Sequence, residues 1–255
     1  MARAHGGRVL LRIEDHDRVR CRPAFDAAIV EDLAWLGFIA DDGTVRQSED
    51  DAPYLAALER LRGEVLVYGC DCSRSMFEAW AHEHGRRWHG PGCPGECRNR
   101  DLSGPVLRLA LGGGSERWMD AIVGPCADEV ASAGDMAARD RDGNWTYGFA
   151  VVVDDLRQRI DLVVRGRDLL SATAGQIRLA RLLGRETAAT FAHHPLIRRP
   201  DGAKLSKADA DTSVRDLRAG GRAPNDLIGE AAAAVGLIDA PRPIAAADVA
   251  SLFAG

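Results

Sequence analysis

The chain has 255 residues, of which 46% are hydrophobic and 28% are charged, and its formal net charge is −5. This composition is typical of a globular protein with a core and excludes an intrinsically disordered chain. The acidic balance argues against non-specific binding of nucleic acid, which depends on Lys and Arg contacts to phosphate, although a local basic patch can still bind a specific RNA.

The sequence shows neither a membrane span nor an export signal. No apolar run reaches the roughly 18 residues of a transmembrane helix, and the segment Met1–Gly7 lacks the apolar stretch of a signal peptide. We therefore expect a cytoplasmic protein whose six cysteines stay reduced and serve as metal ligands or buried thiols.

The first expected strand is the apolar segment Arg8–Ile13, which ends at the acidic residues Glu14 and Asp15. A helix is expected to begin near Pro23, because proline suits the first helical turn, and to end at Gly37. Apolar residues recur at helical spacing between these two positions.

A second helix and a second strand are expected before the chain changes in character. The helix begins near Pro53, with Asp50 or Asp51 as its cap, and the strand covers Val65–Tyr68. From Cys70 to about Gly104 the sequence is rich in cysteine, histidine, glycine and proline. This composition predicts a small insertion with little apolar core of its own.

The second half of the chain alternates between strand and helix patterns. Four strands are expected there: Val106–Leu109, Ala121–Val123, Tyr147–Val153 and Ile160–Val164. A helix capped by Ser171 or Thr173 is expected to follow the last of them. The Ala- and Leu-rich tail from Val214 to Phe253 predicts two or three more helices.

Buried strands that alternate with amphipathic helices predict an α/β fold, with a parallel sheet covered on both faces. We expect the main domain to span residues 1–210, interrupted by the insertion at 69–104, with a helical tail at 211–255. In such sheets, ligands bind beyond the carboxyl ends of the strands. The candidates at these ends are Glu14, Asp15, Asp154, Arg165, Arg167 and Asp168.

Four cysteines of the insertion are spaced like metal ligands. Cys70 and Cys72 form a C-x-C pair, and Cys93 and Cys97 form a C-x3-C pair in a Gly- and Pro-rich turn. Two such pairs predict a closed tetrahedral Zn²⁺ site with a structural role and no catalytic position. The alternatives are four unrelated buried thiols, or one cysteine replaced by a nearby histidine: His82, His84 or His89. The cysteines expected to be small apolar side chains are Cys21 and Cys126.

A polar loop carries two lysines three positions apart, Lys204 and Lys207. Phosphoryl and nucleotidyl transfer require movable positive charge where negative charge accumulates on phosphate oxygens, and lysine supplies it on a flexible stem. Exposed loops often carry two lysines, so an ordinary solvated loop is the alternative. The loop lacks the glycine spacing of a phosphate-binding P-loop.

Four segments, in order along the chain, resemble the motifs of the class I glutamyl-tRNA synthetases. They match the R-I-E-D-x-D segment, the second glutamate-site strand, the V-R-G-x-D-L segment and the K-M-S-K-S loop of that family. These segments are Arg12–Asp17, Arg141–Asp155, Val164–Leu169 and Lys204–Ala208. The resemblance extends from about Arg3 to about Asp209 and implies a Rossmann-like catalytic domain.

The cysteine pattern and the short length resemble one subgroup of the family, the glutamyl-queuosine tRNA(Asp) synthetases. The resemblance implies a monomeric enzyme that activates glutamate with ATP and Mg²⁺ and attaches it to the queuosine base of tRNA(Asp). It also implies zinc ligation by the four cysteines, least firmly by Cys93, because some relatives carry Tyr there. The alternatives are a fragment of a glutamyl-tRNA synthetase that charges tRNA(Glu), and a non-catalytic tRNA-binding remnant.

The resemblance implies roles for individual residues. Glu14 is expected to hold the ammonium group of glutamate, Tyr147 to contact the same amino acid, and Arg165 to pair with one of its carboxylates. Lys207 is expected to bind ATP and stabilise phosphate charge during adenylate formation, with Lys204 assisting.

Each role has a structural alternative. Glu14 can cap the edge of a sheet, Tyr147 can belong to the core, and Arg165 can pair with a nearby aspartate. The aspartates concerned are Asp161 and Asp168. Residues left without a role are Asp154 and Asp155, and residues expected to serve packing are His193 and His194.

The resemblance does not include the first strand of the family or its H-I-G-H-type helix, whose histidines bind ATP phosphates. Met1–Gly7 resembles the end of the helix that follows this motif. We therefore expect a start codon assigned too far downstream, and impaired catalysis by the chain as written.

Overall fold

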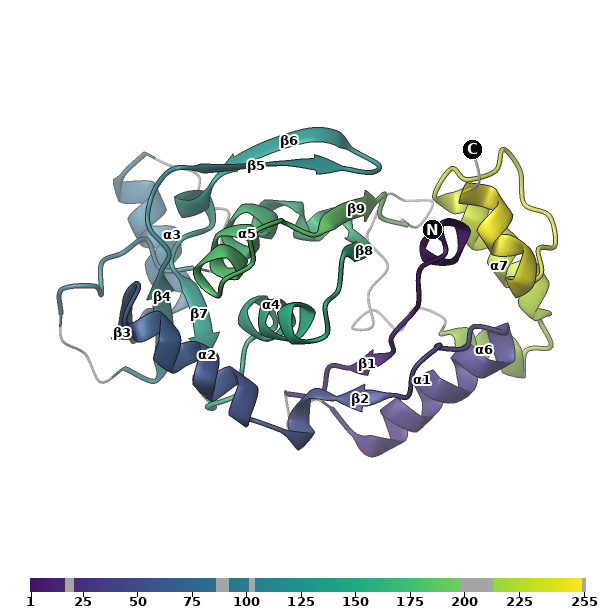
Figure 1. The fold of residues 1–255 in the computed structure, drawn as a ribbon, viewed down its shortest axis with the longest axis horizontal. Coiled ribbons are helices and arrows are strands. Elements are labelled where there is room, and N and C mark those ends of the chain that lie inside the picture. The colour runs from purple at the N-terminus through teal and green to yellow at the C-terminus, as the bar shows by residue number, and fades with distance from the viewer. Residues whose placement is uncertain (17–20, 86–91, 101–103, 198–212, 254–255) are drawn as a thin grey trace. The chain divides into compact units, whose positions relative to one another are not determined.

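A computed structural model describes residues 1–16, 21–85, 92–100, 104–197 and 213–253. The chain divides into two compact units, one formed by Met1–Gln47 with Pro195–Gly255 and the other by Ser48–His194 (Figure 1). The domain boundary expected at residue 210 lies outside the described residues. Within them, no helix combines the length and the apolar character that crossing a membrane requires.

The unit formed by the two ends of the chain is mainly helical. Its elements are η1 (Ala2–His5), β1 (Arg12–Ile13), α1 (Pro23–Leu36), β2 (Val45–Arg46), α6 (Val214–Ala219), α7 (Pro224–Ala234) and η6 (Ala246–Phe253). α1 begins at Pro23 and ends at Gly37, whose φ of 84° is left-handed, as the sequence predicts. The expected strand Arg8–Ile13 is shorter, and only its last two residues pair, in parallel, with β2. The two or three helices expected between Val214 and Phe253 are present as α6, α7 and η6.

The unit Ser48–His194 contains two sheets and four α-helices within its described residues. Its elements are α2 (Ala52–Arg62), β3 (Leu66–Cys70), α3 (Arg74–Glu83), β4 (Val106–Ala110), β5 (Ser115–Asp120), β6 (Gly124–Glu129), η3 (Val130–Ala133), β7 (Met136–Arg139), α4 (Tyr147–Arg157), β8 (Leu162–Gly166), η4 (Arg167–Ala172), α5 (Thr173–Leu182) and β9 (Thr190–His194), with η2 (Gln47–Glu49) at its boundary.

The expected mixture of helices and sheets is confirmed, but parallel pairing is less extensive than predicted. One sheet of the Ser48–His194 unit is antiparallel, with strand order β3-β4-β7. The other has order β6-β5-β9-β8, in which β5, β9 and β8 are parallel and β6 returns antiparallel beside β5. The parallel part aligns the carboxyl ends of β8 and β9, where the candidate site lies.

The core of this unit packs α2, α4 and α5 together. Tyr54, Leu61 and Phe149 are fully buried within it. The indole ring of Trp145 contacts two aromatic rings, with centroids 5.5 Å from Tyr54 and 5.3 Å from Phe149. Aromatic contacts of this kind add to the burial of apolar area, so they anchor the segment that leads into α4.

The prediction of a strand at Tyr147–Val153 is wrong, because this segment forms the first part of α4. A helix buried on all sides shows the same uninterrupted apolar pattern as a buried strand. Every residue from Phe149 to Asp154 is buried, so no polar face reveals the helical period. Tertiary burial here outweighs the weak strand preference of three successive valines.

The prediction of a strand at Ala121–Val123 is also wrong, because this segment is the turn between β5 and β6. The carboxylate of Asp120 accepts hydrogen bonds from the backbone amides of Ile122 and Val123, both at 2.9 Å. An aspartate that binds amides two and three residues ahead stabilises a turn. The apolar residues of this segment therefore do not indicate a strand paired within a sheet.

The other predicted elements of this unit are confirmed with shifted ends. α2 begins at Ala52, whose amide donates to the carboxylate of Asp50 at 3.0 Å. α5 begins at Thr173, but no side chain caps it. The confirmed strands β3, β4 and β8 were expected at Val65–Tyr68, Val106–Leu109 and Ile160–Val164.

Candidate functional site

The four cysteines of the predicted metal site form one buried cluster. Their sulfurs all lie within 4.8 Å of one another, and the residues are Cys70, Cys72, Cys93 and Cys97. A tetrahedral Zn²⁺ ion with sulfurs at about 2.3 Å separates them by about 3.8 Å, so the cluster has the dimensions and the chemistry of such a site. The sulfurs of Cys72 and Cys97 are 3.3 Å apart, much farther than the roughly 2.05 Å of a disulfide.

The histidine alternative finds no support within the described residues. His82 and His84 are exposed, and the ring of His84 stacks on Trp80, with centroids 4.3 Å apart. His89 lies outside the described residues. Cys93 is completely buried inside the cluster. The four cysteines are therefore not unrelated thiols, and Cys93 is part of their cluster.

Hydrogen bonds divide the thiols of the cluster by acidity. A hydrogen bond from Cys70, together with the backbone amides of Gly95 and Cys97, lowers the pKa of Cys93 to about 4 against the effect of burial. Burial raises the pKa of Cys72 to about 12. A bound cation would favour the thiolate at every position.

Asp135 connects the cysteine cluster to its surroundings. Its amide donates to the carbonyl of Cys93 at 2.8 Å. Its carboxylate accepts a hydrogen bond from the hydroxyl of Tyr68 at 2.5 Å and two from Arg98, at 2.6 and 2.5 Å. Cysteines make up most of the buried side chains in this cluster, so it has little apolar packing. The hydrogen bonds of Asp135 therefore help to hold the second cysteine pair in place.

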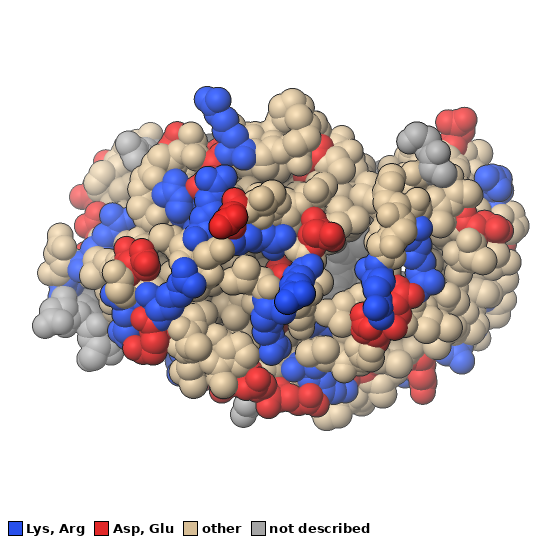
Figure 2. Space-filling view, viewed as in Figure 1, with Lys and Arg blue, Asp and Glu red and all other residues tan. Residues whose placement is uncertain are grey.

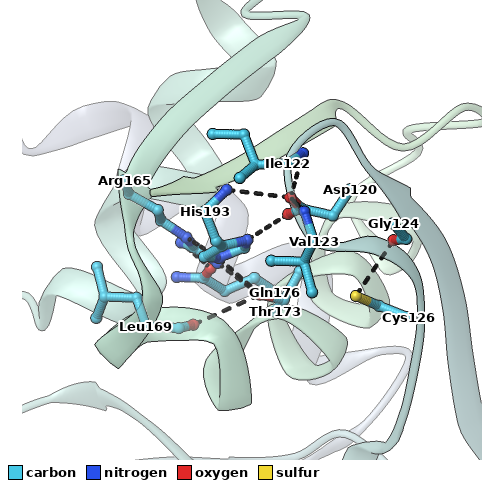
Figure 3. Close-up of polar contacts among 10 residues, drawn as sticks. All are labelled: Asp120, Ile122, Val123, Gly124, Cys126, Arg165, Leu169, Thr173, Gln176 and His193. Carbon is cyan, nitrogen blue, oxygen red and sulfur yellow. Dashed lines mark hydrogen bonds and ion pairs between the residues drawn. The ribbon is translucent and has the colours of Figure 1, made fainter. Parts of the chain in front are cut away.

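Arg165, the predicted carboxylate-binding residue, lies near the end of β8 and is 7% exposed. Its guanidinium donates three hydrogen bonds: to His193 Nε2 at 3.0 Å, to Gln176 Oε1 at 2.6 Å and to Thr173 Oγ1 at 2.9 Å (Figure 3). All three acceptors are uncharged groups. These contacts, and not ion pairs with Asp161 or Asp168, hold the guanidinium.

Asp120 and His193 lie behind this guanidinium. The Nδ1 atom of His193 is 2.5 Å from Asp120 Oδ2, and the backbone amide of His193 donates to Asp120 Oδ1 at 3.2 Å (Figure 3). Burial acts to raise the pKa of Asp120, but hydrogen bonds from His193 and from the amides of Val123 and Ile122 bring this pKa below its ordinary value. Asp120 is therefore an ionised acceptor at neutral pH.

Tyr147, the other predicted glutamate contact in this unit, interacts with Arg165. Burial lowers the pKa of the Arg165 guanidinium, and interactions with Tyr147, Asp155 and Asp120 act in the opposite direction. Tyr147 is the first residue of α4 and is 42% exposed, so it does not belong to the core. The structure therefore brings an accessible phenol together with a buried cation.

A small cavity lies between α4, α5 and the strands β8 and β9. Its volume is about 30 Å³, and Asp155, Arg165 and Gln176 contribute polar atoms to its lining. A cavity of this size holds one or two waters and is too small for an amino acid such as glutamate. It is a hydrated or empty gap behind Arg165 and not a substrate pocket.

The remaining predicted site residues lie elsewhere in the chain. Glu14 belongs to the unit formed by the two chain ends, directly after β1, where its half-exposed carboxylate is 3.5 Å from Arg12. Lys204 and Lys207 lie outside the described residues. The structure thus brings together Tyr147 and Arg165 of the predicted set.

Several residues of this site carry no signal in the sequence. His193 was expected to serve packing, and no motif predicts its partner Asp120 or the other two acceptors of Arg165, Thr173 and Gln176. Only their positions could have revealed them, since β8 and β9 pair in register at Arg165 and His193. Asp154 is also explained, because its buried carboxylate accepts hydrogen bonds from Tyr54 and Arg157.

A model of the catalytic domain of class I tRNA synthetases (E and Q) matches residues 1–231. The chain belongs to this family. The match includes the cysteine cluster, the Arg165 site and the lysine loop, as the four motifs indicate. The expected class I catalytic fold is thereby confirmed.

Curated relatives carry two kinds of name. The glutamyl-Q tRNA(Asp) synthetase of Symbiobacterium thermophilum is 39% identical over 271 aligned residues, which cover 99% of this chain and 84% of that protein. The glutamyl-Q tRNA(Asp) synthetase of Rhodobacter capsulatus is 36% identical, with 89% of this chain and 88% of the relative covered. A glutamate–tRNA ligase of a Synechococcus species is 38% identical, but the alignment covers only 50% of it.

Solved structures show the same fold. The glutamate-tRNA synthetase of Elizabethkingia anophelis has a TM-score of 0.73 at 25% identity, over 92% of this chain and 56% of that one. A glutamate tRNA ligase of Elizabethkingia meningosepticum, solved in complex with its amino acid, has a TM-score of 0.72. The chain spans about half the length of these ligases.

Proposed function

We propose that this protein activates glutamate with ATP and transfers it to the queuosine base of tRNA(Asp). The observation that carries the proposal is the environment of Arg165, a buried guanidinium held by neutral acceptors beside the accessible Tyr147. A buried cation is unfavourable unless an anion compensates it. Glutamate offers two carboxylates, and the chain belongs to the class I tRNA synthetase family labelled E and Q, the one-letter codes of glutamate and glutamine.

Three residues would recognise the amino acid. Arg165 would bind one carboxylate with two parallel hydrogen bonds, which suits the planar guanidinium. Tyr147 would contact the same ligand, since it interacts with Arg165 and is accessible. Glu14, a half-exposed carboxylate at the end of a strand, would bind the ammonium group.

The lysine loop would serve the ATP phosphates. Lys204 and Lys207 are the only lysines in a sequence that contains 33 basic residues, so arginine supplies positive charge everywhere else. The ammonium group is a compact charge on a flexible stem, which suits phosphate oxygens that change their charge during adenylate formation. Mg²⁺ would contact the same phosphates and keep several waters.

The cysteine cluster would hold a structural Zn²⁺ ion. Its fit rests on four buried sulfurs within 4.8 Å of one another. An ion bound by four cysteines has no open coordination position. The ion would therefore have a structural role, joining β3 to the turn that carries the second cysteine pair. It would take no part in the reaction.

The choice of tRNA(Asp) over tRNA(Glu) is supported by the names of relatives. Two proteins named glutamyl-Q tRNA(Asp) synthetase are 39% and 36% identical to this chain. Despite the net charge of −5, basic side chains gather on one face over the unit that contains α4 and α5 (Figure 2). Such a surface suits the phosphate backbone of a tRNA.

Two assays test the proposal in sequence. The first measures ATP–pyrophosphate exchange with glutamate, and with glutamine and aspartate as controls, and we expect whatever exchange occurs to require glutamate. The second measures transfer of labelled glutamate to tRNA(Asp) with queuosine, tRNA(Asp) without queuosine and tRNA(Glu). We expect transfer to the first only. Efficient charging of tRNA(Glu) would select a glutamate–tRNA ligase, and tRNA binding without exchange would select a non-catalytic remnant.

A further inference from the structure

The hydrogen bonds behind Arg165 form a directed chain. Asp120 is ionised and accepts at His193 Nδ1, so the proton of the imidazole lies on Nδ1. The lone pair on His193 Nε2 then faces the Nε–H group of Arg165, which donates to it at 3.0 Å. His193 and Asp120 are 0% and 2% exposed, and Arg165 is 7% exposed, so all three side chains are buried.

These hydrogen bonds hold the guanidinium without a direct ion pair, while Asp155 and Asp120 interact with it electrostatically. A carboxylate in direct contact with Arg165 would compete with a carboxylate ligand for the same N–H groups. Here the carboxylate of Asp120 is one imidazole ring away, and the groups that touch Arg165 are uncharged. An arginine side chain otherwise has about 2 kcal/mol of rotamer entropy to lose on binding. The guanidinium of Arg165 is thus held in one orientation before a ligand binds, and it keeps its positive charge available to that ligand.

We propose that Asp120 and His193 are positioning residues that hold Arg165 in the orientation required to bind the substrate carboxylate. The inference rests on the proposed function, in which Arg165 binds glutamate. Neither side chain touches the substrate. They act through the tautomer of the imidazole, which decides whether His193 Nε2 accepts a hydrogen bond from Arg165 or opposes it with a proton.

The substitution Asp120→Asn isolates this effect. Oδ1 of Asp120 accepts from three backbone amides, those of His193, Ile122 and Val123. An asparagine would keep its carbonyl oxygen at these three donors and so present its NH₂ group to His193 Nδ1. The imidazole would then carry its proton on Nε2, against the Nε–H group of Arg165. The shape of the site would be unchanged, but the hydrogen bond from Arg165 to His193 Nε2 would be lost.

Glu116→Gln provides a matched control. Glu116 is also a buried carboxylate on β5, at 4% exposure, and it binds arginines of α5, with Arg178 at 2.7 Å and Arg181 at 3.4 Å. It makes no contact with Arg165 or His193 in the described structure. Its substitution therefore removes a comparable buried charge without changing the imidazole tautomer.

The test uses the full chain and three measurements. The ¹⁵N chemical shifts of histidine-labelled protein report the tautomer of His193, calorimetry gives the dissociation constant for glutamate, and exchange kinetics separate KM from kcat. For Asp120→Asn we expect a proton on Nε2 and glutamate binding weaker by about 10- to 100-fold, the loss of one buried charge-assisted hydrogen bond, with kcat changed less than KM. Glu116→Gln should retain the wild-type tautomer and affinity.

His193→Gln and His193→Ala give a second test. A glutamine can place its carbonyl oxygen near the position of Nε2 and accept from Arg165, so it should retain more glutamate affinity than alanine does at equal thermal stability. An Asp120→Asn variant with the Nε2 tautomer and wild-type glutamate affinity would overturn the inference. Wild-type protein that binds glutamate but catalyses no exchange would instead overturn the proposed function, while the affinities still decide the role of Asp120. Absence of glutamate binding by the wild type would overturn both.

Discussion

The cysteine cluster and the Arg165 site are two buried polar centres of the same unit with opposite electrostatic needs. The first collects four sulfur atoms, which become thiolates in the presence of a cation. The second buries a cation among neutral acceptors and, in the proposed function, binds a carboxylate. We therefore expect the first centre to require a metal ion in order to fold, and the second to be held by the protein before any ligand binds.

The largest expected effect is the loss of the metal. Cys72→Ser with Cys97→Ser removes two ligands, and because structural Zn²⁺ contributes about 10 kcal/mol or more in small zinc-dependent modules, we expect the region between β3 and β4 to unfold. The zinc content measured by mass spectrometry should fall from one Zn²⁺ per chain to none. A protease should cleave within this region under limited digestion.

Cys126→Ser is the control for this change. Cys126 is half-buried in β6 and donates weakly to the carbonyl of Gly124, at 3.5 Å, away from the cluster. Its substitution should leave the metal content and the proteolysis pattern unchanged. Equal metal content in the double variant and the wild type would contradict a four-cysteine site.

The second effect concerns the anion. Arg165→Lys keeps a positive charge but removes the planar fork and leaves acceptors such as Thr173 Oγ1 and His193 Nε2 without their donors. We expect glutamate affinity to fall by roughly 30- to 1,000-fold, corresponding to about 2–4 kcal/mol. Calorimetry with glutamate measures it, and circular dichroism verifies the fold. Unchanged affinity in a folded variant would remove Arg165 from the amino-acid site.

The two centres also differ in how far the sequence predicts them. The cysteines come in two short pairs of one residue type, so their spacing alone indicates a metal site. The residues that hold Arg165, directly or through His193, belong to α5, β9 and β5 and differ in chemistry. Their convergence depends on strand order and register, which no local pattern encodes. For the same reason a helix buried on every side, α4, has the pattern of a strand.

The third effect tests a buried contact that belongs to neither centre. The hydroxyl of Tyr54 donates to both carboxylate oxygens of Asp154, at 3.1 and 3.0 Å, and both residues are fully buried. Tyr54→Phe leaves this carboxylate with one donor fewer and should lower the free energy of unfolding by about 1–3 kcal/mol. Denaturant titration measures the loss, and glutamate affinity should stay at the wild-type value. A simultaneous loss of affinity would place Asp154 in the substrate site.

The smallest expected effect refines the first centre. Ser73 caps α3 directly after Cys72, and its hydroxyl accepts a hydrogen bond from the amide of Met76 at 3.3 Å. Ser73→Ala should cost about 1 kcal/mol, while Ser73→Asp, which retains a capping oxygen, should cost less. If zinc organises this segment, the difference between the two variants should appear in thermal unfolding of the metal-free protein and shrink when Zn²⁺ is bound, because the metal then fixes the residue before the cap. An equal difference in both states would show that the helix folds independently of the cysteine cluster.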